Sequence, residues 1–189
     1  MRQHGPIAAA AMMIGAVMAS TAPGAVSAAS AQESGVGPVT KLPLPRYASL
    51  KTDRVNLREG PSKDHRTLWV FQRAGLPVEI VGEFETWRRI RDSEGTEGWV
   101  LHSLLSGRRT AIVNAGPEKN GIKPDVPLRS SPDDTSADEA RLQTGVIGSV
   151  KKCTGGWCRL IVSLPSKRDV DGYIRQNRLW GVYPNETVD

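Results

Sequence analysis

The sequence predicts an all-β protein made of two tandem small β-barrels. Three observations support this prediction: an internal repeat, a high content of Gly and Pro, and short runs of alternating apolar residues. The 189 residues include 19 Gly and 13 Pro, or about one residue in six, against an average usage of about one in eight. This composition excludes a long-helix or coiled-coil protein. Five Trp and many aliphatic residues exclude a generally disordered chain.

The internal repeat indicates two copies of one unit of about 60–70 residues, the size of a single small barrel. Three blocks of the first copy recur in the second at offsets of 71, 70 and 74 residues: 55–61 with 126–132, 75–90 with 145–160, and 98–100 with 172–174. We therefore expect one barrel over 46–109 and a second, more degenerate barrel over 110–184, followed by a tail at 185–189.

Within the first copy, apolar and polar residues alternate in short runs separated by Gly-containing turns. The strands expected from this pattern are 48–51, 55–58, 67–71, 78–83, 87–91 and 98–101. Five or six short strands favour a closed or nearly closed barrel, because closure removes exposed strand edges. The second copy begins near 110–113 and has longer loops. Its segment 133–143 is expected to form one helical turn, capped by Ser136 or Asp138.

The N-terminal residues have the pattern of a cleaved secretory signal. An uncharged run of small and apolar residues from 7 to about 22 is followed by small-residue cleavage motifs that end at Ala28 and Ala31. A transmembrane anchor is the alternative, but Pro23 breaks the run, which is short for a bilayer needing about 20 apolar residues. No Cys lies near the cleavage motifs. We predict a signal peptide over 1–31, no lipid anchor, and a periplasmic or secreted protein.

The segment after the signal, 32–45, is rich in Gly, Pro and small residues and is expected to be a tether. Its end, Leu-Pro-Leu-Pro-Arg at 42–46, favours a stiff polyproline conformation. Docking of this stretch onto a groove of the chain's own barrel is the alternative.

The two cysteines, Cys153 and Cys158, flank a predicted tight hairpin turn, Gly155-Gly156. Counting outward from this turn places the cysteines opposite each other on a non-hydrogen-bonded rung, where Cα atoms lie about 4.5 Å apart. A structural disulfide is therefore expected, in keeping with export to an oxidising compartment. The four-residue spacing disfavours a redox-active pair, and the lack of a nearby His disfavours a metal site.

The register of the repeat aligns the two cysteines with Glu83 and Arg88 of the first copy. If the two hairpins are equivalent, the first barrel has a cross-strand ion pair where the second has its disulfide. Opposite charges on one rung contribute roughly 0.2–1 kcal/mol. We therefore expect the two hairpins to be held by different chemistry at the same place.

Four blocks of the first copy together resemble the bacterial SH3 (SH3b-like) domain family: Val-Asn-Leu-Arg-Glu-Gly-Pro at 55–61, Ala-Gly-Leu-Pro-Val-Glu-Ile-Val at 74–81, Trp-Arg-Arg-Ile at 87–90 and Glu-Gly-Trp-Val at 97–100. The second copy is similar but degenerate, with Tyr173 in place of the Trp of the last block. The segment around Trp87 is similar to a group of exported alphaproteobacterial SH3-like proteins of unassigned activity. The resemblance implies SH3-like barrels, an envelope location and a binding role without catalysis.

The sequence contains no constellation that points to catalysis. After the signal, the only histidines are His65 and His102, far apart and remote from any nucleophile motif. No phosphate-binding Gly-rich loop, His-Glu-x-x-His or Cys-x-x-Cys motif is present. Asp92, Glu94 and Glu97 could be paired catalytic acids, but a solvated turn is the simpler interpretation. We expect no catalytic residue, metal site or cofactor.

The best candidates for ligand binding are Trp69, Trp87 and Trp99 together with Arg89. Ring faces suit sugars, peptides and cations, and the net charge of +5 suits an anionic partner. The alternative is that Trp87 and Trp99 pack at the ends of the barrel.

We therefore predict a non-catalytic binding or adaptor module of the cell envelope, directed to the cell wall (peptidoglycan) or to an envelope protein and not to nucleic acid. One alternative is a structural or accessory subunit of an envelope complex that docks through its basic face. A second is a wall hydrolase, which would need a catalytic dyad that the sequence lacks.

Overall fold

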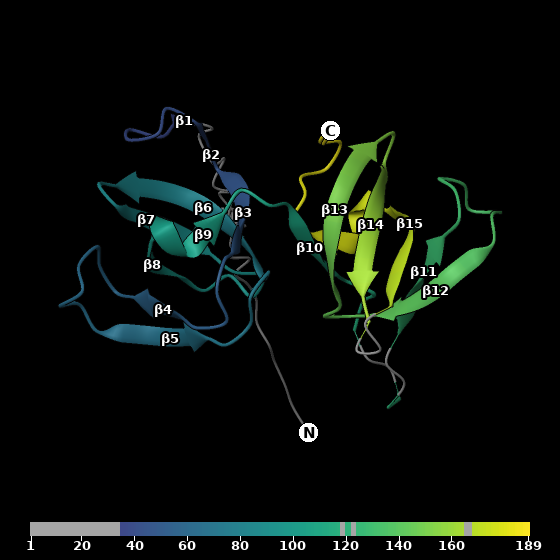
Figure 1. Cartoon of the computed structure of the whole chain (residues 1–189), viewed down its shortest axis with the longest axis horizontal. Coiled ribbons are helices and arrows are strands. Elements are labelled where there is room, and N and C mark those ends of the chain that lie inside the picture. Colours follow the sequence, from purple (N-terminus) through teal and green to yellow (C-terminus); the bar gives the residue numbers. More distant parts are fainter. Residues whose placement is uncertain (1–34, 118–119, 122–123, 165–167) are drawn as a thin grey trace, which may run out of the picture. The chain divides into compact units, whose positions relative to one another are not determined.

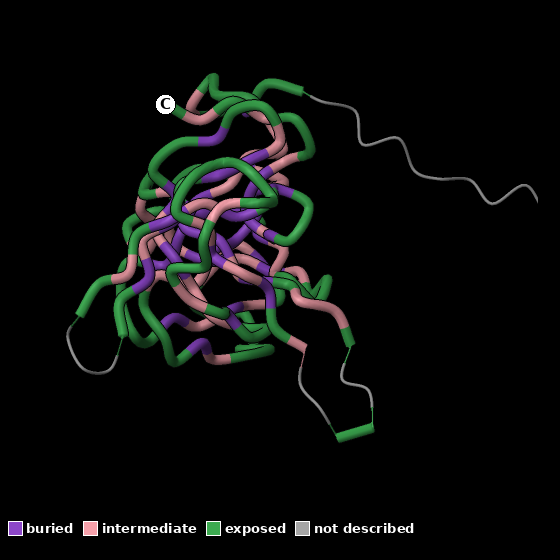
Figure 2. Tube along the Cα trace, turned by 90° about the vertical axis from the view of Figure 1, so that its right-hand side faces the viewer, coloured by how far each residue is buried: buried purple, intermediate pink, exposed green. Residues whose placement is uncertain are grey.

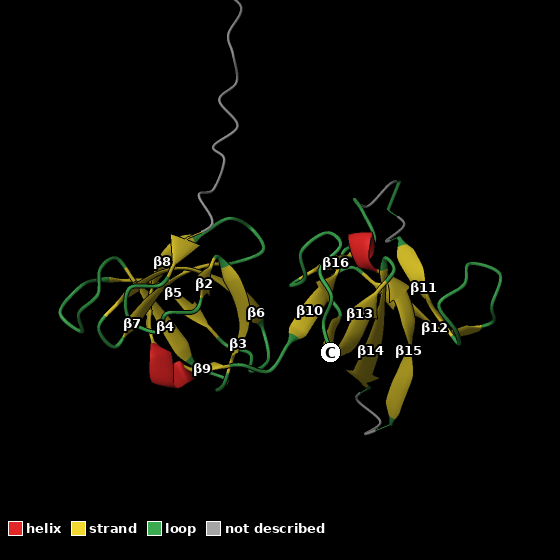
Figure 3. Cartoon of the chain, turned by 90° about the horizontal axis from the view of Figure 1, so that it is seen from above, coloured by secondary structure: helices red, strands yellow, loops and turns green. Residues whose placement is uncertain are grey.

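The computed structural model describes residues 35–117, 120–121, 124–164 and 168–189. The signal peptide predicted over 1–31 lies outside these residues. The described chain is all-β, with two seven-stranded antiparallel sheets that each bend into a small barrel (Figure 1), as the sequence predicts. Two short 3-10 turns occur, and within the described ranges no α-helix does (Figure 3). In the same part of the chain, no helix has the length and apolar character that crossing a bilayer requires.

Barrel 1 has the strand order β5-β4-β8-β7-β6-β3-β9. Its elements are β3 (Arg46–Leu50), β4 (Val55–Arg58), β5 (Thr67–Phe71), β6 (Pro77–Phe84), β7 (Trp87–Arg91), β8 (Glu97–Leu101), η1 (His102–Leu104) and β9 (Leu105–Ser106). Three of these strands, β4, β5 and β7, begin and end at the predicted residues. The alternation of buried and exposed side chains, seen most clearly in β4 and β8, is the physical reason that the sequence pattern located them.

Barrel 2 repeats this order as β12-β11-β15-β14-β13-β10-β16. Its elements are β10 (Thr110–Val113), β11 (Asp125–Arg129), β12 (Asp138–Gln143), β13 (Ile147–Thr154), β14 (Trp157–Ser163), β15 (Asp169–Arg175), η2 (Gln176–Arg178) and β16 (Leu179–Trp180). Strand for strand, barrel 2 therefore has the topology of barrel 1, which is what the sequence repeat implies.

The helical turn expected over 133–143 is wrong. The segment turns at Asp133, whose Oδ1 accepts the N–H of Thr135, and then becomes β12, paired with β11. Neither predicted cap works as a cap, since Ser136 donates its hydroxyl to the carbonyl of Ser131 and Asp138 accepts from Arg129. The pairing partner β11 decides the conformation, and that partner is not visible in local sequence.

The two barrels share backbone features as well as strand order. In both, the register shifts by one residue in the longest strand of the sheet, between Ile80 and Gly82 in β6 and between Val150 and Lys152 in β13. A Cβ added to Gly98 would lie 2.8 Å from the carbonyl oxygen of Arg58. A Cβ added to the equivalent glycine, Gly172, would lie 2.7 Å from the carbonyl oxygen of Arg129. Only glycine permits this close approach of neighbouring strands.

Each barrel has its own apolar core, and Figure 2 shows the buried segments of the chain in purple. The core of barrel 1 consists of Ala48, Leu50, Val55, Leu57, Phe71, Val78, Ile80, Ile90 and Val100. The core of barrel 2 consists of Ala111, Val113, Val126, Leu128, Leu142, Val150, Cys153, Cys158, Leu160, Val162, Ile174, Leu179 and Val182. Since burial of apolar surface is the dominant stabilising term in folding, each barrel carries its own source of stability.

The predicted correspondence between the two hairpins is confirmed. Cys153 lies opposite Cys158 and forms a disulfide, with the Cα atoms 4.1 Å apart. At the equivalent rung of barrel 1, Glu83 lies opposite Arg88, and Glu83 Oε1 is 3.6 Å from Arg88 Nε. Both side chains of this pair are buried, so the pair is an internal feature and not a surface salt bridge.

Residues 35–45, where a tether was expected, form a small hairpin on barrel 1. Strands β1 (Gly35–Val36) and β2 (Pro43–Leu44) pair with each other, and Leu44 packs against the core. The buried Glu83 carboxylate fixes the loop between them: it accepts the N–H groups of Val39 (3.0 Å) and Thr40 (2.8 Å) and the hydroxyl of Thr40 (2.5 Å). The Pro-rich stretch thus packs on the barrel core and lines none of the hollows described below.

Residues 185–189, expected to be a tail, are also bound to a barrel. Val188 exchanges two backbone hydrogen bonds with Cys153, of 2.8 and 3.1 Å, and Glu186 accepts two hydrogen bonds from Arg109. The N-terminal hairpin and the C-terminal residues therefore attach at equivalent rungs of the two barrels, at Glu83 in one and at Cys153 in the other.

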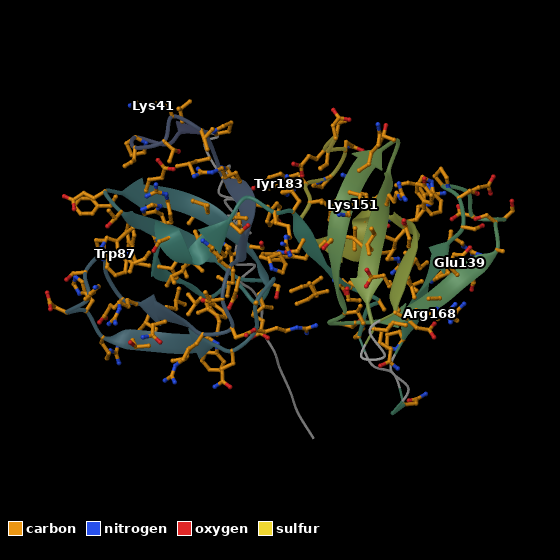
Figure 4. All side chains as sticks on the ribbon, in the orientation of Figure 1. Lys41, Trp87, Glu139, Lys151, Arg168 and Tyr183 are labelled. Atoms are coloured by element: carbon orange, nitrogen blue, oxygen red, sulfur yellow. A yellow bond between two sulfur atoms is a disulfide. The ribbon has the colours of Figure 1, made fainter. Side chains whose placement is uncertain are left out.

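Aromatic residues connect the C-terminal segment to barrel 1. The ring of Tyr47 lies edge-on to Trp180, with centroids 5.2 Å apart, and 4.6 Å from the ring of Tyr183. The Tyr183 hydroxyl donates to Glu79 Oε1 at 2.9 Å. Burial, and then the hydrogen bond to Glu79, raise the pKa of Tyr183 above its ordinary value. Trp180 and Tyr183 thus pack against the first barrel (Tyr183 is labelled in Figure 4).

Candidate binding site

Three of the four predicted ligand residues lie on one outward face of barrel 1. Alternate residues of a strand share a face, which places Trp87 and Arg89 of β7 together. The register then pairs Arg89 with Trp99 of β8, and Trp99 in turn with Arg58 of β4. Trp99 therefore lies between two arginines on three adjacent strands. We call the residues Arg58, Trp87, Arg89, Trp99 and Leu101 the basic face.

A hollow of about 280 Å³ adjoins this face. Its lining combines cations with apolar side chains, namely Arg54, Asn56, Arg58, Lys63, Trp87, Leu101 and Leu104. A second, wider hollow shares Lys63, Trp87 and Leu101 with it and extends along η1. Such a surface can bind a carboxylate or phosphate group while covering the apolar part of the same ligand.

The aromatic residues of the basic face differ in exposure. Trp87, labelled in Figure 4, is only 7% exposed and lines both hollows. Trp99 is half-buried, so part of its ring is open to a ligand. Trp87 therefore supports the site largely by packing, and Trp99 offers the accessible ring face.

Arg89 and Arg58 of the basic face, and the neighbouring Arg91, are held in place by oxygen acceptors. Arg89 Nη2 is 2.8 Å from Glu97 Oε2, and Arg91 Nε is 2.8 Å from Glu97 Oε1. Hydrogen bonding to Glu97 raises the pKa of Arg91 further above its already high ordinary value. Arg58 donates to the carbonyl of His65 at 2.8 Å. These contacts orient the guanidinium groups and lower the entropy cost of binding an anion.

The fourth predicted residue, Trp69, is not part of this face. It lies on β5 opposite Leu57, which points into the core, whereas Arg58 and Trp99 point the other way. Trp69 is 60% exposed and lines a separate hollow of about 300 Å³ with apolar residues and with Asp92 and Glu94. The sequence could not show that Trp69 lies on a different surface from Trp87 and Trp99, because their positions depend on the register between strands.

Barrel 2 has an equivalent hollow, of about 160 Å³, beside Trp157. There the guanidinium of Arg175 lies over the Trp157 ring, 4.2 Å from its centroid, and Arg175 also forms an ion pair with Asp134. The repeat places Leu101 and Lys63 of barrel 1 at the positions of Arg175 and Asp134. Barrel 2 therefore covers its tryptophan with its own arginine, and barrel 1 does not.

Several residues of this site were not predicted from the sequence. Arg54, Arg58 and Lys63 were not singled out, although Arg58 recurs in the repeat as Arg129. The repeat alignment also places Lys63 and Leu101 of barrel 1 at the positions of Asp134 and Arg175 of barrel 2. The importance of these two differences becomes clear only from the hollows that the residues line. None of these residues belongs to a sequence motif. They line one hollow only in the folded barrel, where the loop after β4 brings Lys63 next to Arg58 and Trp87.

One family model matches the sequence twice, once in each barrel. The sequence profile described as "Bacterial SH3 domain" matches residues 51–107 and 123–181, together more than half of the chain. No curated protein matches the sequence significantly.

Solved structures similar to this chain include NlpC2 and NlpC1 from Trichomonas vaginalis and an NlpC/P60 family protein from Bacillus cereus. Their identities to this chain are 14%, 15% and 11%, with TM-scores of 0.31, 0.31 and 0.30. The matches cover 72%, 71% and 71% of this chain, and 48%, 45% and 55% of those structures. The chain thus spans about half the length of these proteins.

Proposed function

Since the chain belongs to the bacterial SH3 domain family, we propose that it is a non-catalytic binding module of the cell envelope. Barrel 1 binds the cell wall through the basic face. The observation that carries this proposal is the position of Trp99 between Arg58 and Arg89, next to a hollow lined by further cations. A wall peptide offers carboxylates to the cations, and its glycan offers sugar rings to the exposed ring face.

The disulfide supports an envelope location. Disulfides persist in the periplasm and outside the cell and are rare in the cytosol, and Cys153 and Cys158 are joined. We infer a periplasmic or secreted protein, exported by the signal peptide predicted over 1–31.

We propose barrel 1 as the binding barrel because, in barrel 2, the tryptophan beside the equivalent hollow is already covered by an arginine of the same barrel. In barrel 2, Arg175 covers Trp157 and forms an exposed ion pair with Asp134, so a ligand would have to displace Arg175 from the ring. In barrel 1 the equivalent positions are Leu101 and Lys63, both of which line open hollows. The second barrel then serves to support the first, to which its C-terminal aromatics are attached.

We expect the leaderless chain, residues 32–189, which contains both barrel cores, to cosediment with purified peptidoglycan. Binding should weaken with salt, because exposed charges are screened. Trp99→Ala should reduce the affinity roughly tenfold, the effect of losing one stacked ring. Trp99 is chosen over Trp87 because Trp87 is buried and its loss would disturb packing. The measurement is the bound fraction as a function of peptidoglycan concentration at low and high salt.

The chain supplies a matched control for this experiment. Tyr173 of β15 lies between Arg129 and Arg159, as Trp99 lies between its two arginines, so Tyr173→Ala removes the same kind of side chain from barrel 2. Equal losses from both variants would contradict the assignment to barrel 1. Absence of binding at either salt concentration would contradict wall binding and favour docking to an envelope protein, which crosslinking would detect. Loss of wall turbidity would indicate a hydrolase.

A further inference from the structure

Barrel 1 carries a second surface, at the edge of its sheet, that the wall-binding proposal does not use. Strand β5 is the first strand in the order of this sheet and lies at the border of barrel 1 in Figure 1. Leu68 and Trp69 on this strand are 40% and 60% exposed. An edge strand presents backbone N–H and C=O groups that can pair with another chain, and exposed apolar side chains favour such pairing.

The equivalent edge of barrel 2 shows that the fold does not require this surface. The register pairs Leu57 with Trp69 and Leu128 with Ala140, so Glu139, Ala140 and Arg141 replace Leu68, Trp69 and Val70. Arg141 is bound to Asp125 and Asp138, which makes β12 a charged edge. Charged edge strands resist pairing with other chains. Within one chain, therefore, one barrel has a protected edge and the other an apolar one.

The hollow beside β5 has an acidic wall. Leu68, Trp69 and Phe71 line one part of it, and Asp92 and Glu94 line another. Asp92 is fixed in a tight turn, since its Oδ1 accepts the N–H groups of Glu94 and Thr96 at 3.0 and 2.8 Å. The acidic wall is opposite in sign to the net charge of the chain, which is +5, and to the basic face of the same barrel.

Barrel 2 provides an example of a cationic side chain that contacts both a tryptophan ring and a carboxylate. In barrel 2, Arg175 lies over the Trp157 ring and forms an ion pair with Asp134. In the hollow beside β5, whose lining also includes Ile112 of β10, Trp69, Asp92 and Glu94 supply the same two chemical groups, and the Trp69 side chain is exposed. A cation above an indole ring is attracted to the face of the ring, and the attraction grows when the cation is also partly desolvated.

We propose that this surface binds an extended, basic peptide segment of a partner protein. The segment adds an antiparallel strand to β5, and a Lys or Arg side chain lies over Trp69 with its charged end toward Asp92 and Glu94. Strand addition supplies affinity through main-chain hydrogen bonds, and the hollow supplies specificity for the side chain. Because the two surfaces have opposite charge, this site selects a different ligand from the basic face, and the chain can join the wall to a protein.

Two peptides of equal length test the proposal: acetyl-Val-Lys-Val-Lys-Val-amide and its Glu-containing counterpart. NMR amide shifts are followed in residues 32–189 during titration. The Lys peptide should shift the amides of β5 and of the turn at Asp92, and should bind at least about tenfold more tightly than the Glu peptide. Trp69→Ala and Glu94→Lys should each abolish this preference. Both residues are exposed, so neither substitution should impair folding.

Trp99→Ala is the matched control, since it removes a tryptophan from the other face and should leave the Lys peptide bound. Equal affinity for both peptides, or unchanged binding after Trp69→Ala, would overturn the proposal. The absence of amide shifts would also overturn it. Shifts that depend on protein concentration alone would overturn it as well, because they would show that a second copy of this chain occupies the surface. Trp69→Ala should not alter cosedimentation with peptidoglycan, so the outcome is independent of the wall-binding test.

Discussion

Glu83→Gln is expected to release the N-terminal hairpin from barrel 1 and to lower the stability of the barrel by about 3–5 kcal/mol, the cost of breaking a buried ion pair. The Glu83 side chain is fully buried. It accepts three hydrogen bonds from Val39 and Thr40 and lies 2.8 Å from Arg46 Nη2. Glutamine has nearly the same size but no charge, and its amide would put a donor among these donors.

Chemical denaturation monitored by Trp fluorescence measures the stability loss, and limited trypsin digestion measures release of the hairpin. Lys41 lies in the hairpin loop (Figure 4), so cleavage after it should become faster in the variant. Glu85→Gln, two residues away at an exposed hairpin tip, is the control and should change neither measurement. Unchanged protection of Lys41 in Glu83→Gln would show that the hairpin is held by something other than this carboxylate.

The same carboxylate makes the stability of barrel 1 depend on pH. Burial raises the pKa of Glu83, but the hydrogen bonds from Thr40, Arg46 and Val39 outweigh burial and lower it from 4.5 to about 2. Because the pKa is lower in the folded state, the stabilisation is fully present above pH 4.5 and is lost as the pH falls from there toward 2. The loss amounts to a few kcal/mol and should be absent in Glu83→Gln, which urea denaturation between pH 2 and pH 6 would reveal.

Reduction of the disulfide is expected to destabilise barrel 2 by about 2 kcal/mol, the effect of a short cross-linked loop, and to leave barrel 1 nearly unchanged. Cys153 and Cys158 are both completely buried and belong to the core of barrel 2 alone. Hydrogen exchange of the whole chain, with and without reducing agent, measures both barrels in one sample. The amides of β13 and β14 should exchange faster, and those of β6 and β7 should not.

Barrel 1 is the internal control for this prediction, because its equivalent rung is held by Glu83 and Arg88, which a reducing agent does not affect. The backbone bonds between Cys153 and Val188 should loosen together with β13. Equal acceleration of exchange in both barrels would contradict independent stabilisation of the two rungs.

Much of the fold is present in local sequence. Strands β4, β5 and β7 could be placed to the residue, because their side chains alternate and Gly-containing turns separate them. The repeat then predicted that Glu83–Arg88 and Cys153–Cys158 occupy equivalent rungs, since the position of a rung depends only on its count from the hairpin turn. These features depend on local sequence, or follow for one barrel from the aligned residues of the other.

Features that depend on distant partners could not be predicted. The segment 133–143 contains residues that often cap helices, but it forms a turn and then strand β12 (Asp138–Gln143), because β11 offers it a strand to pair with. The Pro-rich segment before barrel 1 folds back because the carboxylate of Glu83, far along the chain, accepts its N–H groups. Local propensity is weak compared with such hydrogen bonds and burial.

The site divides in the same way. The two-barrel architecture, the disulfide and the candidate tryptophans and arginine could be predicted, because they follow from residue pattern, spacing and chemistry. The grouping of the side chains could not: Trp99 lies with Arg58 and Arg89 on one face, Trp69 lies apart beside acidic residues, and Arg175 covers Trp157. This grouping depends on the register between strands, which sets the neighbours of each side chain and exists only in the folded sheet.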